Sequence, residues 1–182
     1  MGMDLEVLNE ALHVARASER MGRLRSTDWP DLAVALLVEG ADDQEVAELA
    51  GLNRHASGWT IATLVDSICA RYGVASRDAE SAVALLARLM AAEFRARPGV
   101  VTEPMIRALA PLAPWEFDSD LANRCYRVRE FLDCDCQADE EDQALEDQLE
   151  ALPGPQIPDS LVQTLAYPLR SALPTTQPPR SH

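Results

Sequence analysis

The apolar residues between Asp42 and Gly73 recur at helical spacing, and this pattern limits the fold more than any other feature of the chain. The stretch contains two apolar segments joined by a short corner. In the second segment, apolar residues form two neighbouring rows, made of Trp59, Ala62, Val65, Cys69 and Tyr72 and of Ile61, Leu64 and Ile68. Because the two rows together cover most of the helix surface, we expect a buried helix with Trp59 in the core.

The apolar residues of the whole chain are mainly alanine and leucine, and aromatic residues make up only 5% of it. Alanine and leucine favour helices, whereas strands favour β-branched and aromatic residues. A chain of 182 residues is also long enough to enclose a core. We therefore predict an all-α fold, an irregular bundle of six to eight helices.

Amphipathic patterns place these helices along the chain. Besides the pair at 42–73, they predict helices at about residues 4–24, 29–40, 76–97, 102–109 and 119–132. The clearest apolar stripe consists of Ala79, Val83, Leu86, Met90 and Phe94. Trp29 and Pro30 open their helix, since proline lacks the N–H that a first turn leaves unpaired, and Gly40 ends it. The stripe of the first helix consists of Leu5, Leu8, Leu12 and Ala15. His13 lies beside this stripe, and we expect it at the boundary of the core.

The C-terminal part of the chain has a different composition. Residues 133–152 have the pattern of one more helix, with a thin apolar side made of Ala138, Leu145, Leu149 and Leu152. Like charges at four-residue spacing weaken this helix, so we expect it to be stable only when docked. Seven of the twelve prolines lie at or beyond Pro153. We therefore predict a helical domain, 1–152, and a proline-rich, loosely ordered C-terminal extension, 153–182, with the least structure from Pro168 onward.

Negative charge is concentrated in one segment of the chain. The formal net charge is −14, and residues 133–150 carry nine acids and no base. Such a charge opposes binding to nucleic acid or to an anionic membrane, and it favours a protein partner with a basic surface. We predict that this partner binds Asp139, Glu140, Glu141, Asp142 and Glu146. The alternative is a solvated acidic face that only keeps the protein in solution.

No set of residues points to a reaction. The chain has no glycine-rich phosphate loop, and its three histidines, one of them at the C-terminal end, suggest no Ser-His-Asp arrangement. We predict a non-enzymatic protein without cofactor or metal, which acts by protein-protein interaction as an immunity, antitoxin or regulatory factor does.

A second hypothesis comes from the first part of the opening stretch. Residues 44–53, QEVAELAGLN, resemble the first helix and turn of the helix-turn-helix of LacI-type repressors, and residues 60–65 resemble the recognition helix of that family. This resemblance implies a transcription regulator that uses residues 44–66. Residues 54–59 are about four residues longer than the corner of that family. The net charge of −3 over residues 42–73 also departs from it, as do the apolar residues in the second helix, Trp59, Ile61, Leu64 and Ile68.

A third hypothesis rests on two carboxylate pairs. Glu45 with Glu48, and Glu130 with Asp133, have the spacing of the magnesium-binding pairs in all-helical nucleotide pyrophosphohydrolases, which they resemble. The resemblance implies a small metal-dependent hydrolase. More than eighty residues separate the two pairs, however, and no basic phosphate clamp surrounds them.

The cysteines leave a metal or redox role open at one place. Cys134 and Cys136 alternate with Asp133 and Asp135, but zinc sites usually space paired cysteines by two to four residues and need two further ligands. The carboxylates also raise the pKa of the thiols, which favours an exposed acidic hinge. We expect all four cysteines to be reduced in a cytoplasmic protein, since no signal-peptide or membrane-span pattern is present. All sixteen basic residues are arginine, a bias typical of GC-rich bacterial genomes.

Overall fold

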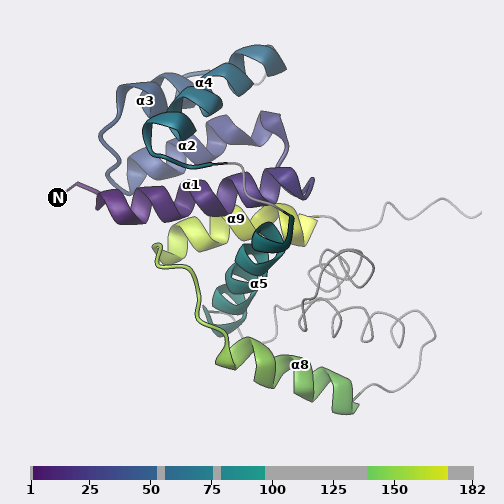
Figure 1. Cartoon of the computed structure of the whole chain (residues 1–182). Coiled ribbons are helices and arrows are strands. Elements are labelled where there is room, and N and C mark those ends of the chain that lie inside the picture. The colour runs from purple at the N-terminus through teal and green to yellow at the C-terminus, as the bar shows by residue number, and fades with distance from the viewer. Residues whose placement is uncertain (1, 53–55, 76–78, 97–138, 172–182) are drawn as a thin grey trace, which may run out of the picture.

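The computed structural model describes residues 2–52, 56–75, 79–96 and 139–171. Within these ranges it contains seven α-helices, one short 3-10 helix, η1 (Ser26–Asp28), and no strand, which confirms the all-α prediction (Figure 1). The α-helices are α1 (Leu5–Arg20), α2 (Trp29–Val38), α3 (Gln44–Ala50), α4 (Gly58–Arg71), α5 (Ala79–Ala96), α8 (Asp139–Ala151) and α9 (Asp159–Ser171). The helices predicted at 102–109 and 119–132 lie outside the described residues.

One hydrophobic core connects all seven helices. Helix α1 packs against α5, α2 packs against α3, and α9 contacts α1, α2 and α5. The apolar stripe predicted for α1 is buried at Leu8, Leu12 and Ala15, whereas Leu5 at its start is exposed. The largest fully buried side chains are Leu12, Trp29, Leu32, Leu36, Leu49, Ile61, Leu86, Leu89, Met90 and Leu149.

Helix α2 begins and ends where the local sequence signals place it. Trp29 and Pro30 form its first turn, and Gly40 follows its end with a φ of 94°, which glycine adopts without strain. Its apolar run is not buried all round, because Val34 and Val38 face solvent while the opposite side enters the core. Helix α2 therefore has one buried side.

Helix α4 contradicts the prediction of a buried helix with Trp59 in the core. Ile61, Val65, Ile68 and Cys69 are buried, but Trp59 is 78% exposed. An α-helix has 3.6 residues per turn, so the six residues from Trp59 to Val65 place the two about 120° apart around the axis. The two side chains therefore lie on different faces, and α4 is an amphipathic helix whose outward face starts at Trp59.

Helix α9 lies within the part of the chain expected to be proline-rich and loosely ordered. Four of its apolar side chains are buried in the common core, namely Leu161, Val162, Leu165 and Ala166. The Ser160 hydroxyl also donates a hydrogen bond to Glu39, which follows α2. Helix α9 is thus part of the packed bundle through its residues 161–166. The division of the chain at residue 153 stays a prediction, and residues 172–182 lie outside the described part.

Candidate interaction surfaces

Helix α8 has one side in the core and one side in solvent. Leu145 and Leu149 are buried where α8 packs against α5, whereas Glu146, Asp147 and Glu150 are exposed. Figure 1 shows α8 at the opposite end of the molecule from α3 and α4. The exposed acids Glu146, Asp147 and Glu150 of α8 therefore lie at one end of the described bundle.

Two arginines of α5 hold the C-terminal end of α8 in place. The Arg95 guanidinium donates hydrogen bonds to the carbonyl oxygen of Leu149, at 3.1 Å, and to that of Leu152. Arg88 donates to the carbonyl oxygen of Gly154 at 3.1 Å, in the loop that follows. The last carbonyl groups of a helix have no partner within it and attract cations. These contacts stabilise the end of α8 and fix its direction relative to α5.

The predicted binding residues all belong to α8. Asp139, Glu140, Glu141 and Asp142 form its first turn, where the helix dipole favours acidic residues, and Glu146 is exposed one turn further on. The dipole offsets part of the repulsion that we expected between these acids. The fold brings the five residues onto one docked helix.

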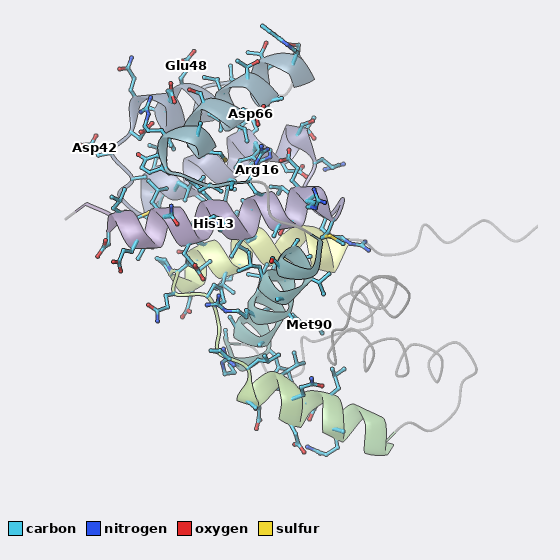
Figure 2. The ribbon with its side chains drawn as sticks, viewed as in Figure 1. His13, Arg16, Asp42, Glu48, Asp66 and Met90 are labelled. Carbon is cyan, nitrogen blue, oxygen red and sulfur yellow. The ribbon has the colours of Figure 1, made fainter. Side chains whose placement is uncertain are left out.

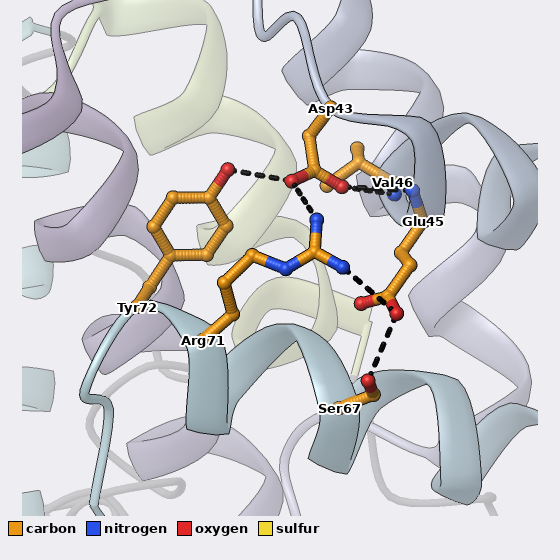
Figure 3. Close-up of polar contacts among 6 residues, drawn as sticks. All are labelled: Asp43, Glu45, Val46, Ser67, Arg71 and Tyr72. Atoms are coloured by element: carbon orange, nitrogen blue, oxygen red, sulfur yellow. Dashed lines mark hydrogen bonds and ion pairs between the residues drawn. The ribbon is translucent and has the colours of Figure 1, made fainter.

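A polar network joins the start of α3 to the end of α4 (Figure 3). One carboxylate oxygen of Asp43 accepts hydrogen bonds from the backbone N–H groups of Glu45 and Val46, at 2.8 and 3.0 Å, and so caps α3. The other oxygen accepts from the Arg71 guanidinium and from the Tyr72 hydroxyl, both at 2.7 Å. A single buried carboxylate therefore connects two helices.

The network changes the acidity of its members. Burial alone would raise the pKa of Asp43, but hydrogen bonds from Tyr72 and the two backbone N–H groups, together with the charge of Arg71, hold that pKa below its ordinary value. Burial and the bond to Asp43 raise the pKa of Tyr72 to about 12. Glu45 completes the network, since one of its oxygens accepts from Arg71 at 2.9 Å and from Ser67 at 3.0 Å. These charges serve the packing of α3 against α4.

The helical corner has two helices where the resemblance to a helix-turn-helix places them. Ile61 and Ile68, two of the apolar residues by which the second helix departs from a recognition helix, are buried. The outward face of α4 instead carries Trp59, Ala62 and Thr63, followed by the acid Asp66. The regulator hypothesis stays a prediction, and this face offers an acid where a groove-binding helix needs polar or basic side chains.

The carboxylate pairs and the cysteines are placed only in part. Glu45 is bonded to Arg71 and Ser67, and Glu48 is exposed, while Glu130, Asp133, Cys125, Cys134 and Cys136 lie outside the described residues. Cys69 has a free, buried thiol, and burial raises its pKa to about 11, which makes it a poor nucleophile. Among the side chains that the structure describes, no three of His, Cys, Asp or Glu are grouped as a metal site requires.

An open pocket of about 210 Å³ lies beside α1, and its polar lining carries charges of both signs. It is lined by His13, Arg16, Ala17, Glu19, Arg20, Ala75 and Ala82. Arg16 donates to Glu19 and to Asp66 of α4, each at 2.6 Å (Figure 2), and the Trp29 indole N–H donates to Glu19 at 3.0 Å. His13 is half-buried here, at the edge of the core as predicted. The ion pair between Arg16 and Asp66 joins α1 to α4, and the hydrogen bond from Trp29 to Glu19 joins α1 to α2.

No known protein family, curated protein or solved structure matches this chain. No helix in the described part of the chain is long and apolar enough to cross a membrane. In the part of the chain that the structure describes, two surfaces combine exposure with distinct chemistry, the acidic side of α8 and the outward face of α4.

Proposed function

We propose that this protein is a non-enzymatic factor that binds another protein through the acidic side of α8. The partner presents a basic surface, and the protein works as an immunity, antitoxin or regulatory factor does. The observation that carries the proposal is that α8 buries one side in the core and leaves its acidic side in solvent. Leu145 and Leu149 hold the helix on the bundle while Glu146, Asp147 and Glu150 remain in solvent.

A docked helix suits this task for two reasons. Arg88 and Arg95 fix the end of α8, so little conformational freedom is left to lose when a partner binds. The absence of any base in residues 133–150 also leaves their negative field uncompensated within that segment. Such a field speeds up association with a surface of opposite charge.

The test compares three versions of the full chain. One is the natural sequence, and the second carries Glu146→Gln, Asp147→Asn and Glu150→Gln on α8. The third carries Glu6→Gln, Asp42→Asn and Asp159→Asn, which change the net charge equally at exposed positions elsewhere. Each version is immobilised and exposed to lysate from the organism that makes it, and the captured proteins are identified.

We expect a basic protein that the natural and third versions capture and that the α8 variant does not. Its association rate with the natural chain should fall about tenfold or more as salt is added, because ions screen charges beyond about 10 Å at 0.1 M. Identical sets of captured proteins from all three versions would mean that the acidic side of α8 is only solvated surface.

A further inference from the structure

Helix α4 presents a tryptophan to solvent at the end of the molecule remote from α8. Trp59 is 78% exposed, whereas Trp29 is 2% exposed. Ala62, Thr63 and Asp66 follow Trp59 at steps of three, four and seven residues, and all are exposed. These steps place the four side chains on one side of the helix, which we call the α4 face. Tryptophan is among the residues that contribute most to protein interfaces, and here it is flanked by small side chains.

The first turn of α4 is held in place around this indole. Ser57 caps the helix, since its hydroxyl oxygen accepts a hydrogen bond from the backbone N–H of Thr60 at 3.1 Å. The Thr63 hydroxyl donates to the carbonyl oxygen of Trp59 at 2.9 Å. The exposed indole therefore projects from an ordered helix rather than from a frayed end.

The described residues at this end of the molecule include exposed acids. Glu48 and Asp66 are exposed on α3 and α4, at the same end of the molecule (Figure 2). Two arginines described at this end of the molecule are paired with acids. Arg16 donates to Asp66, and Arg71 donates to Asp43. Among the described residues at this end of the molecule, a cation from outside would thus meet exposed acid, with Arg16 and Arg71 already paired.

We propose that the α4 face is a docking site for a segment of another protein that carries arginine or lysine. The cation stacks on the ring of Trp59, where the π-electrons attract it, and the alkyl part of its side chain lies over Ala62 and Thr63. The exposed carboxylate of Glu48 on α3 adds attraction at the same end of the molecule, whereas Asp66 is already paired with Arg16. This site is separate from α8 and does not depend on the function proposed for that helix.

The same charges argue against two other occupants. Residues 42–73 carry a net charge of −3, so a nucleic acid would bring phosphates towards acids. A second copy would bring another chain of net charge −14 to the same place. A basic protein segment is the occupant that fits both the indole and the field around it.

The experiment uses the full chain with ¹⁵N-labelled indole groups and follows the Trp59 N–H resonance by NMR. That resonance is identified by its absence from the spectrum of Trp59→Phe. The probe is a short helical peptide of alanine, leucine and arginine, and its twin has glutamate in place of arginine. We expect the arginine peptide to shift the Trp59 resonance and the amides of Ala62, Thr63 and Asp66, and the glutamate twin to leave them unchanged.

The affinities of variants for the arginine peptide distinguish binding at Trp59 from nonspecific attraction between opposite charges. The affinity should fall tenfold or more in Trp59→Ala, fall less in Trp59→Phe, which keeps an aromatic ring, and stay unchanged in Val38→Ala. Val38 is also 78% exposed and serves as the matched control. Neutral substitutions at the exposed acids of α8 should leave the Trp59 shift in place, which separates this result from the test of α8.

Three outcomes would overturn the proposal. The first is equal affinity for the arginine peptide in the natural chain and Trp59→Ala. The second is a Trp59 resonance that moves with protein concentration in the absence of peptide, which would identify a second copy as the occupant. The third is a shift caused by a DNA duplex at low salt, which would favour nucleic acid.

Discussion

Trp29 and Trp59 occupy opposite environments, and their substitutions should differ accordingly. We expect Trp29→Ala to lower the free energy of unfolding by about 3–5 kcal/mol, because it removes a buried ring, and Trp59→Ala to lower it by less than about 1 kcal/mol. Urea unfolding followed by circular dichroism measures both without depending on tryptophan fluorescence. A loss above about 2 kcal/mol in Trp59→Ala would show that the indole is packed.

Asp43 should make stability depend on pH in the acid range. Its pKa in the folded protein lies below the value of about 3.9 expected when unfolded, so its contribution is present above about pH 4 and is lost as pH falls through the folded pKa. Asp43→Asn still caps a helix but lacks the charge that meets Arg71. We therefore expect unfolding free energy to fall less steeply with acid in this variant than in the natural chain.

Circular dichroism at a series of pH values measures that difference. The control is Glu6→Gln, which removes an acid that is exposed in the first turn of α1. Its acid unfolding curve should be closer to that of the natural chain than the curve of Asp43→Asn is. Parallel curves for the natural chain and Asp43→Asn would mean that the contacts of Asp43 with Arg71 and Tyr72 contribute nothing to the acid response.

The sequence could reveal only half of the network around Asp43. An aspartate just before an apolar helical pattern is a local signal for a helix cap, and such signals can be read from neighbouring residues. Arg71 and Tyr72 lie almost thirty residues away, and only the packing of α3 against α4 brings them to the same carboxylate. The fold of the corner, rather than any motif, creates this contact.

At the scale of the helix, prediction succeeded where one apolar stripe was unambiguous. The described residues of the α5 stripe, Val83, Leu86, Met90 and Phe94, are all buried. In α4, apolar residues occur on more than one side, and periodicity alone does not say which side the core will take. The neighbouring helices decide this, and they bury Ile61 and Ile68 and leave Trp59 outside.

The position of α8 should depend on Arg95. We expect Arg95→Gln to speed up amide hydrogen exchange in α8 about tenfold or more, because two carbonyl oxygens near its C-terminal end lose a charged donor. Exchange in α3 and α4 should not change. Mass spectrometry of peptides from each helix gives the comparison.

Arg20→Gln provides the control for that experiment. Arg20 is also an exposed arginine in the last turn of its helix, α1, and its substitution should leave exchange in α8 as it is. Equal protection of α8 in the natural chain and Arg95→Gln would assign the docking of this helix to Leu145 and Leu149 alone.

At the scale of the whole molecule, α9 should be needed for cooperative folding. Its buried residues Leu161, Val162, Leu165 and Ala166 together stabilise the bundle by about 5 kcal/mol or more, which is comparable with the total stability of many domains. We expect a chain that ends at residue 152 to lose its sharp thermal transition. Calorimetry measures this, and a chain that ends at residue 171 keeps α9 and serves as control. A sharp, unshifted transition in the shorter chain would make 1–152 a domain in its own right.

Composition predicted the class of the fold, but it did not predict which helices distant in the sequence contact each other. The abundance of alanine and leucine indicated helices, and the structure contains them. The prolines of residues 153–182 favoured the prediction of a loosely ordered extension, but Pro155 and Pro158 precede α9, and Pro168 lies near its C-terminal end, after the buried residues Leu161, Val162, Leu165 and Ala166. Tertiary packing determines which helices contact α9, and no local sequence pattern predicts these contacts.

The placement of α4 and α8 at opposite ends of the bundle has a consequence for stoichiometry. Occupants of the two surfaces would not compete for space, so one chain could hold two different proteins at the same time. Each bound protein would then keep the other nearby at a high effective concentration, even if the two have no affinity for each other. A small acidic bundle of this shape can therefore serve as a bridge, and the distance between its ends sets how far apart the bridged proteins lie.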